Sequence, residues 1–436
     1  MGREGGKRAP GEGGEGCGLS AGKGATCLRN MYLLLMTSAI APTPKYRIES
    51  IDLLRGLVML IMAIDHVRDH VHLGHPDPTD LATTTPILFL TRWATHFCAP
   101  IFVFLSGVSA YLAGTRRTEN QLSVFLLKRG LWLIVVEVVL ISLSLTLNPI
   151  YSVLVLQVIW AIGGSMILLG LLIALKAPRI VIGIIGVVIV FGHNIFDIVD
   201  PGAIGKTTIW HLLVSANGFT DANILKIGHH HFILIAYALL PWTGVMLIGY
   251  VIGPIYSASF DAVKRRKLLL YSGLGVLAFF FLFRAFNIYG DPAPWSVQKT
   301  AVLSVLSFLN VTKYPCSLLY LCMTLGIGLV ILGSVEKLHN KFISIVVVYG
   351  NVPFFYYVCH WYLIGLIHII VFFAQGFKTS QIVDPNLPFL FEPAGCGVGL
   401  GGVYLIWLLV IGLLYWPCRW FSRYKKTHRQ WWLSYV

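Results

Sequence analysis

The sequence has very little charge for its length. Asp, Glu, Lys and Arg make up 12% of its 436 residues, whereas 56% of the residues are hydrophobic. A soluble protein would carry about 25% charged residues. Apolar runs long enough to cross a hydrocarbon core of roughly 30 Å recur along most of the chain, and they are too continuous for the alternating strands of a membrane barrel. The composition therefore predicts an all-α fold, a polytopic membrane helix bundle.

A cysteine framework is also lacking. The eight cysteines show no spacing that is typical of a metal or redox motif. Four of them lie in apolar segments, where a cysteine usually serves as a small packing residue. These four are Cys98, Cys316, Cys322 and Cys359. We expect neither a disulfide framework nor a thiolate metal site.

Acidic residues are outnumbered, with 19 Asp and Glu against 33 Lys and Arg. In a soluble protein a net charge of +14 would suggest nucleic-acid binding, but in a membrane protein it reflects topology, because cytoplasmic loops collect Lys and Arg. With the N-terminus inside, 24 of the basic residues fall on the cytoplasmic side and seven outside. The pattern predicts about ten transmembrane helices with both termini cytoplasmic. The expected spans are 51–71, 87–114, 122–147, 151–175, 179–199, 229–252, 268–288, 315–334, 342–374 and 398–416.

Composition divides the chain into three parts. Residues 1–45 are rich in glycine, so we expect a disordered cytoplasmic tail. Met31 or Met36 can serve as the start, in which case the preceding stretch is an upstream extension. Residues 46–418 form the transmembrane domain. Residues 419–436 form a basic, aromatic cytoplasmic tail.

Ionisable residues interrupt the first apolar segment. On a helix, Asp52, Arg55, His66 and His70 fall on one stripe. Intramembrane charges are costly and are therefore functional candidates. Asp52 and Arg55, three residues apart, can form an ion pair, and a purely structural role for that pair is equally open. His66 and His70 are spaced to share a metal ion, but no HExxH glutamate and no third ligand can be identified, so we expect no metal.

The run DHVRDHVHLGHPD places several histidines at the outer end of this segment. Histidine titrates near neutrality and can accept and return a proton in one turnover. His66, His70 and His75 are the candidates, and we expect them to gather around one outward-facing cavity with His96 and His360.

Glu137 and Arg284 are the remaining charges inside the predicted spans. Arg284 can pair with Glu137, Asp65 or Asp69, and the sequence leaves these three pairings open. The ninth span contains GNVP at 350–353 and is too long for a single perpendicular crossing. Pro353 lacks a backbone donor, so a break or kink is expected there, with or without a role in a site.

Two segments carry a family resemblance. RIESIDLLRGLVMLIMAIDH and APIFVFLSGVSAYL resemble the first two helices of the transmembrane acyltransferases related to heparan-alpha-glucosaminide N-acetyltransferase. Those helices carry S-x-D-x-x-R-G and P-x-F-V-F-x-x-G patterns. The tail CRWFSRYKKTHRQWWLSYV resembles those of bacterial members of uncharacterised function. The resemblance implies an integral, multi-pass protein, with the inner membrane of a bacterium as the expected location.

The resemblance also implies an activity. Members transfer an acetyl group from cytosolic acetyl-CoA to an amine or hydroxyl acceptor on the far side of the membrane. The family's catalytic histidine falls nearest His75, with His70 and His72 open, whereas His66 stands where the family has an asparagine. Asp65 or Asp69 would orient the imidazole. The phosphates of acyl-CoA would meet Arg55 (paired with Asp52), Lys128, Arg129 and the KRRK loop at 264–267. The acceptor would contact His96, His360 and Arg284.

Two further function classes compete with acyl transfer. A proton-coupled transporter would use the same Asp, Arg and His residues as a relay, but the two halves show no convincing inverted repeat. A structural or regulatory membrane subunit would tolerate replacement of its intramembrane charges. The favoured reading is an acyltransferase with the bilayer, acyl-CoA and a sugar or glycan as partners, a homo-oligomer being possible and nucleic acid not expected.

Overall fold

A computed structural model describes residues 49–215, 223–227, 231–336, 338, 340–383 and 389–435. The predicted tail over residues 1–45 lies outside these residues. Chain contacts separate Met1–Arg47 from Ile48–Val436, and all that follows concerns the second unit. The helices of the described residues are α2 (Glu49–Val71), α3 (Pro86–Thr95), α4 (Cys98–Gly114), α5 (Glu119–Val136), α6 (Ser142–Thr146), α7 (Val158–Ala174), α8 (Arg179–Gly192), α9 (Thr208–Leu213), α10 (Leu239–Ile252), α11 (Ala262–Phe286), α12 (Ala301–Leu309), α13 (Leu318–Val335), α14 (Lys341–Asn351), α15 (Pro353–Ala374) and α16 (Leu400–Thr427). The strands are β1 (Val153–Leu156), β2 (Ile224–Ile227) and β3 (His231–Ile235).

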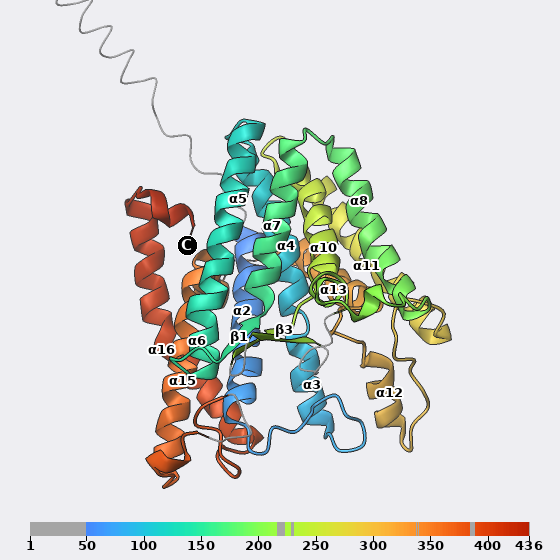
Figure 1. Cartoon of the computed structure of the whole chain (residues 1–436). Helices are drawn as coiled ribbons and strands as arrows, with labels where there is room; N and C mark the ends of the chain where they lie inside the picture. The colour runs from blue at the N-terminus through green and yellow to red at the C-terminus, as the bar shows by residue number, and fades with distance from the viewer. Residues whose placement is uncertain are drawn as a thin grey trace, which may run out of the picture. The chain divides into compact units, whose positions relative to one another are not determined.

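The described residues are mostly helical, which confirms the predicted fold class at that level (Figure 1). Within them, seven helical stretches are long and apolar enough to cross a membrane. They are Pro86–Gly114, Arg179–Asp197, Leu239–Tyr256, Ala262–Phe286, Leu318–Val335, Pro353–Ala374 and Leu400–Thr427. Helix α2 is also long enough, but it carries several charged residues. Asp52, Asp65 and Arg68 among them are buried inside the bundle.

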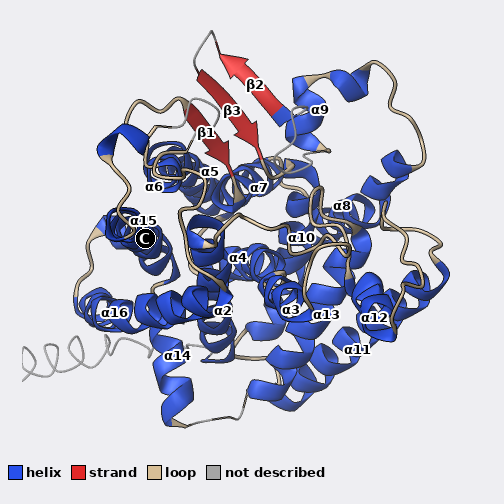
Figure 2. Ribbon diagram, turned by 90° about the horizontal axis from the view of Figure 1, so that it is seen from below, coloured by secondary structure: helices blue, strands red, loops and turns tan. Residues whose placement is uncertain are grey.

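Helix α2 lies among several other helices and is the element on which the site is built (Figures 1 and 2). Its first half packs against α14 at two glycines. A Cβ atom on Gly350 would meet the Asp52 carbonyl oxygen at 1.8 Å, and one on Gly56 would meet the Val346 carbonyl oxygen at 2.1 Å. Two backbones that approach this closely leave no room for a side chain, so glycine is required at both positions.

The predicted break in the ninth span is confirmed. Helix α14 ends at Asn351 and α15 begins at Pro353, which occupies the first turn of the new helix, where its missing N–H costs nothing. The two half-helices therefore take different courses along α2. Helix α14 packs on the N-terminal half of α2, and α15 brings its own polar residues beside the C-terminal half.

Two of the predicted spans begin as strands instead of helices. Residues 153–156, expected in the fourth span, form β1, and residues 231–235, expected in the sixth, form β3. They pair in parallel, with Val153 opposite Phe232, while β2 pairs antiparallel to β3. The small sheet lies beside α6, α7 and α9 (Figure 2). Short apolar runs fit a strand as well as a helix, and the partner that decides between them is distant in the sequence.

Candidate active site

Helices α2 and α15 bring two histidines into direct contact. The Nδ1 atom of His66 lies 2.7 Å from the Nε2 atom of His360. The His66 ring also stacks on the indole of Trp361, with ring centroids 3.9 Å apart and planes inclined by 20°. His360 is completely buried, whereas His66 is half-buried. The imidazole of His66 is thus held on one face by an aromatic ring and on one edge by a second imidazole.

The contacts of His360 define where the protons lie in the neutral pair. Its Nδ1 atom is 3.0 Å from the Tyr356 carbonyl oxygen, which can only accept, so Nδ1 carries the proton. The Nε2 atom of a neutral His360 is then an acceptor, and the Nδ1–H of His66 donates to it. The remaining nitrogen of His66, Nε2, consequently holds a lone pair. This arrangement leaves His66 able to accept a proton.

Two more histidines extend the cluster towards the outer end of α2. His70 is buried, its ring lies 5.3 Å from that of Trp361 and 6.1 Å from that of His368, and neither of its nitrogens has a hydrogen-bond partner. The Nε2 atom of His368 contacts the Phe391 carbonyl oxygen at 2.8 Å. The structure therefore brings together two of the predicted candidates on α2, His66 and His70, with the predicted His360.

Asp65 pairs with arginines instead of a histidine. Its carboxylate contacts Arg92 from α3, and lies 2.8 Å from Nη2 of Arg68. Arg68 also contacts Asp69 at 2.6 Å. Asp65 or Asp69 was expected to orient an imidazole, but the described contacts of both carboxylates are with the guanidinium groups of Arg68 and Arg92. The described contact that orients His66 comes from His360.

His75 makes no described contact with His66, although its charge reaches His368. It follows α2 in an exposed loop with a positive φ of 41°, and its N–H donates to the His72 carbonyl oxygen at 3.1 Å. His72 is buried, and burial together with the charge of Arg68 lowers its pKa. A positive φ is uncommon for a residue with a side chain, because it strains the backbone. Among the candidates from the resemblance, His75 is therefore exposed, whereas His70 and His72 are buried.

The loop that covers this outer end contains a carboxyl group with an unusual pKa. Burial, and then the nearby charge of Asp69, raise the pKa of Glu392 to about 7 from the ordinary value of 4.5. A raised pKa means that the folded protein binds the proton more tightly than the unfolded chain does. The stabilising contribution is complete below about pH 4.5 and is lost as the pH rises through about 7.

We therefore expect the melting temperature of the protein to fall relative to that of Glu392→Gln as the pH rises from 4.5 to 7. The glutamine variant keeps a neutral group at this position at every pH. Thermal unfolding of both proteins across this range is the measurement. Parallel curves for the two proteins would contradict the assignment to Glu392.

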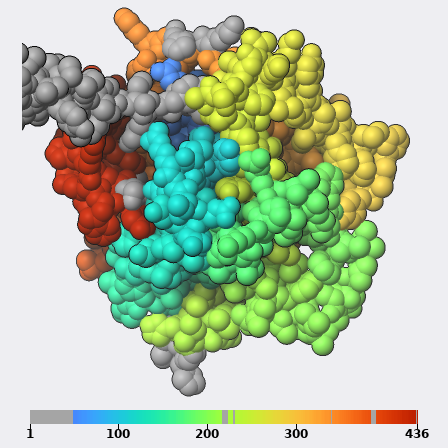
Figure 3. Space-filling view, turned by 90° about the horizontal axis from the view of Figure 1, so that it is seen from above, coloured from blue at the N-terminus to red at the C-terminus, as the bar shows by residue number. Residues whose placement is uncertain are grey.

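A second polar cluster lies at the other end of α2. Arg55 and Asp52 are paired at 3.1 Å, as the spacing predicts, and Nη2 of Arg55 donates to Ser109 Oγ at 3.1 Å. Arg129 on α5 lies close enough to be affected by the charge of Arg55. Lys128 is exposed beside it. Arg55 and Arg129, two of the predicted donor-binding cations, are thus close to each other, and Lys128 precedes Arg129 in the middle of α5. Figure 3 views the molecule from the end at which α5 begins.

The other predicted charges have different surroundings. Arg284 is 1% exposed, and its guanidinium donates to the carbonyl oxygens of Ala293, Ser307, Phe308 and Asn310. None of the three pairings left open for Arg284 is among the described contacts, because its carboxylate partner is Asp291, 3.7 Å from Nη1. Glu137 instead accepts from the N–H groups of Gln157 and Trp160 at 3.1 Å each. The contacts of Arg284 therefore indicate that it stabilises the loop around residues 290–310, in place of the expected contact with the acceptor.

His96, which was expected in the same cavity as His66, lies near Asp65 and Arg92. It is buried against Tyr320, with ring centroids 5.5 Å apart, and the charges of Arg92 and Asp65 reach it. It therefore borders the arginine–aspartate group but makes no described contact with His66. Within the described part of the chain, no three His, Cys, Asp or Glu side chains come together as a possible metal site.

Sequence reasoning missed three residues of this site. Trp361 and Arg92 contact His66 and Asp65 directly, and Tyr356 supplies the carbonyl group that fixes His360. Only one of them had a visible signal, because Trp361 directly follows a candidate histidine. The contact of Arg92 with Asp65 depends on how α3 lies against α2. Tyr356 and His360 are four residues apart on α15, so their contact is local to one helix.

Comparison with known proteins identifies the family of the chain. A family model described as heparan-alpha-glucosaminide N-acetyltransferase, catalytic, matches residues 47–283, more than half of the sequence. The chain belongs to this family. The match confirms the resemblance found in the first two helices. A search of curated proteins finds no match.

The family membership fits a transmembrane acetyltransferase and does not favour a transporter. Together with the seven apolar helices, it supports an integral membrane protein. The matched region of the heparan-alpha-glucosaminide N-acetyltransferase family contains His66, Asp65 and Arg92 but ends before α15. His360 and Trp361, which hold His66, are therefore contributed by a part of the chain that the family model does not cover.

Proposed function

We propose that the protein is an integral membrane acetyltransferase that moves an acetyl group from cytosolic acetyl-CoA to an amine or hydroxyl of a sugar or cell-envelope glycan on the outer face. The observation that carries the proposal is the His66–His360 pair at 2.7 Å, whose outer member retains a lone pair. The bacterial inner membrane is the expected location.

In this proposal His66 is the general base. Its Nε2 atom takes the proton from the acceptor amine or hydroxyl as the acceptor oxygen or nitrogen bonds to the acetyl carbon. The C–S bond of the thioester breaks, and the protonated imidazole returns its proton to the departing sulfur. His360 supports the positive charge on His66 through the Nδ1–H bond, and Trp361 holds the ring in place. Atoms and protons therefore balance within one turnover.

The cations at the other end of α2 suit the donor. Acetyl-CoA supplies an acetyl thioester on a long arm that ends in phosphates. Arg55, Arg129 and Lys128 provide charge complementary to phosphates, and Arg guanidinium groups bind phosphate oxygens well. Arg55 and His66 are eleven residues apart, a rise of about 16 Å along one helix. One straight helix thus links the charged end to the histidine pair.

This arrangement requires a defined topology. We propose about ten transmembrane segments with both termini cytoplasmic, supported by the distribution of Lys and Arg. Reporter fusions after Lys341 and after residue 385 are expected to read inside and outside, respectively, because in this topology α14 and α15 together make one crossing. Fusions that read on the same side would contradict the topology.

The activity is tested with the full-length protein purified in detergent. Acetyl-CoA labelled in the acetyl group is mixed with glucosamine or with glucosamine oligomers, and labelled product is measured beside acetyl-CoA binding. Transfer that requires His66 supports the proposal. Tight acetyl-CoA binding without transfer to any amine or hydroxyl acceptor would contradict it.

A further inference from the structure

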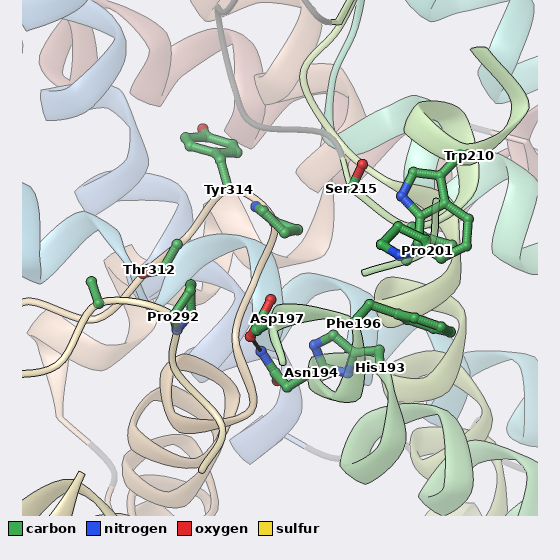
Figure 4. A pocket seen from close by; sticks show the side chains of 13 residues that line it. His193, Asn194, Phe196, Asp197, Pro201, Trp210, Ser215, Pro292, Thr312 and Tyr314 are labelled. Atoms are coloured by element: carbon green, nitrogen blue, oxygen red, sulfur yellow. Dashed lines mark hydrogen bonds between the residues drawn. The ribbon is translucent and has the colours of Figure 1, made fainter. Parts of the chain in front are cut away.

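A cavity of about 530 Å³ lies apart from the histidine pair (Figure 4). Two segments form it. One runs from the end of α8 through η2 (His193–Asp197) to α9, and the other is the loop that joins α11 to α13. Trp210 and Phe196 lie on one side of the view, Thr312 and Pro292 on the other, and Asn194 and Asp197 lie between them.

The lining combines aromatic faces with hydrogen-bonding groups. Trp210 and Phe196 pack edge to face, with ring centroids 4.7 Å apart. Tyr314 adds a third ring, while Asp197, Thr312 and Ser215 offer oxygen atoms. An aromatic ring gives an apolar surface with few rotatable bonds, and a small number of placed polar groups gives orientation. A saccharide has the matching chemistry, with C–H groups on the ring face and hydroxyl groups on its rim.

The polar groups of the cavity are held in place by other contacts. Asn194 accepts from the Leu318 N–H at 2.8 Å, so its Nδ2 group points to Asp197 Oδ2, at 2.6 Å. Asp291 accepts from both the N–H and the hydroxyl of Thr312 at 2.9 Å. Side chains that are oriented before a ligand arrives lose little entropy on binding. The described contacts of Asp197 occupy one of its oxygens and leave Oδ1 for a ligand.

The cavity shares a wall with the surroundings of the histidine pair. Tyr314 lines the cavity, and its ring lies 5.5 Å from that of Tyr237. The neighbouring Lys313, whose ammonium lies over the Tyr314 ring, is close enough to act electrostatically on Asp65 and His66. Lys313 and Tyr314 thus link the lining of the cavity to the group around Asp65.

We propose that this cavity is a saccharide-binding subsite that holds an unmodified unit of an oligosaccharide acceptor, next to the unit that receives the acetyl group. The proposal rests on the proposed function. Asp197 is the carboxylate among the lining residues, so an amino sugar or a neutral sugar fits better than a phosphorylated or sulfated one. Trp210 would stack on the sugar ring, and Asp197 would accept from a hydroxyl or ammonium group.

The first experiment measures saccharide binding in the absence of donor. The full-length protein in detergent is titrated calorimetrically with glucosamine, with its β-1,4-linked trimer, and with trimers of N-acetylglucosamine and of glucose. At least one trimer is expected to bind at least tenfold more tightly than its monomer. Equal affinities of monomer and trimer for all three sugars would overturn the proposal.

Variants then locate the binding. Trp210→Ala and Asp197→Ala are expected to weaken trimer binding about tenfold, whereas Trp210→Phe, which keeps a ring, retains most of it. Ile209→Ala is the matched control, because Ile209 is 68% exposed on the same short helix and does not line the cavity. Melting temperatures verify that each variant is folded. Trimer affinity unchanged in both alanine variants would also overturn the proposal.

Acetyl transfer separates this proposal from the proposed function. With the trimer as acceptor, Trp210→Ala is expected to raise KM about tenfold with kcat unchanged. A wild-type protein that transfers to monomer and trimer with equal KM keeps the proposed function and loses the subsite. A protein that binds the trimer through Trp210 but transfers no acetyl group keeps the subsite and loses the proposed function.

Discussion

Replacement of His66 by alanine is expected to lower kcat for acetyl transfer by a factor of about 10²–10⁴. The variant loses the nitrogen that accepts the acceptor's proton, while the cations around Arg55 remain, so its affinity for acetyl-CoA should be near that of the wild type. Activity of the wild type should also fall towards acid pH, because protonation removes the reactive lone pair. Product formation and acetyl-CoA binding are measured in parallel.

His75→Ala is the informative comparison. The family resemblance places the catalytic histidine nearest His75, whereas the structure places His75 in an exposed loop and His66 against His360. If His66 is the base, His75→Ala should keep most of the activity. The reverse result, with His66→Ala active and His75→Ala inactive, would transfer the role to the loop. Trp361→Phe should have a smaller effect than His66→Ala, because it preserves a ring beside the imidazole.

Loss of the Asp65 carboxylate is expected to destabilise the protein by about 3–5 kcal/mol. Asp65 is 6% exposed and lies between Arg68 and Arg92, so Asp65→Ala leaves buried positive charges without their counter-ion. Unfolding of the purified protein in bicelles, followed by heat or denaturant, gives the change in stability.

Asp69→Ala is the matched control, since it removes a carboxylate from the same arginine. The side chain of Asp69 is 48% exposed, so we expect a loss of at most about 1 kcal/mol. Adding Arg92→Met to Asp65→Ala should recover part of the lost stability, because it removes one of the uncompensated charges. Similar losses for Asp65→Ala and Asp69→Ala would contradict the central place of Asp65 in this group.

The sequence was sufficient where the cause of the structure is local. The break before Pro353 follows from the missing N–H of proline, and the Asp52–Arg55 pair follows from the spacing of a single helix. The strand Val153–Leu156 was missed, because an apolar run of this length fits either element and its partner β3 lies far along the chain.

The candidate site shows the same division. His66, His70 and His360 were recognisable as unusual polar residues in apolar segments. Their arrangement was not, since His66 and His360 are separated by 294 residues and meet only because α15 lies beside α2. The contact of Asp65 with Arg92 could not be predicted either, because it depends on the packing of α3 against α2. Arg284 looked like a ligand for substrate, whereas the backbone carbonyl groups around it use its donors.

The contact between His360 and the Tyr356 carbonyl oxygen has a consequence for energy coupling. A carbonyl oxygen accepts a hydrogen bond but cannot be protonated at physiological pH, so a proton that reaches His360 has no acceptor beyond it. The pair can hold a proton and give it back, but by this route it cannot conduct one across the bilayer. A proton taken up by this pair would therefore return to the side from which it came, and the pair itself would draw no work from the membrane potential.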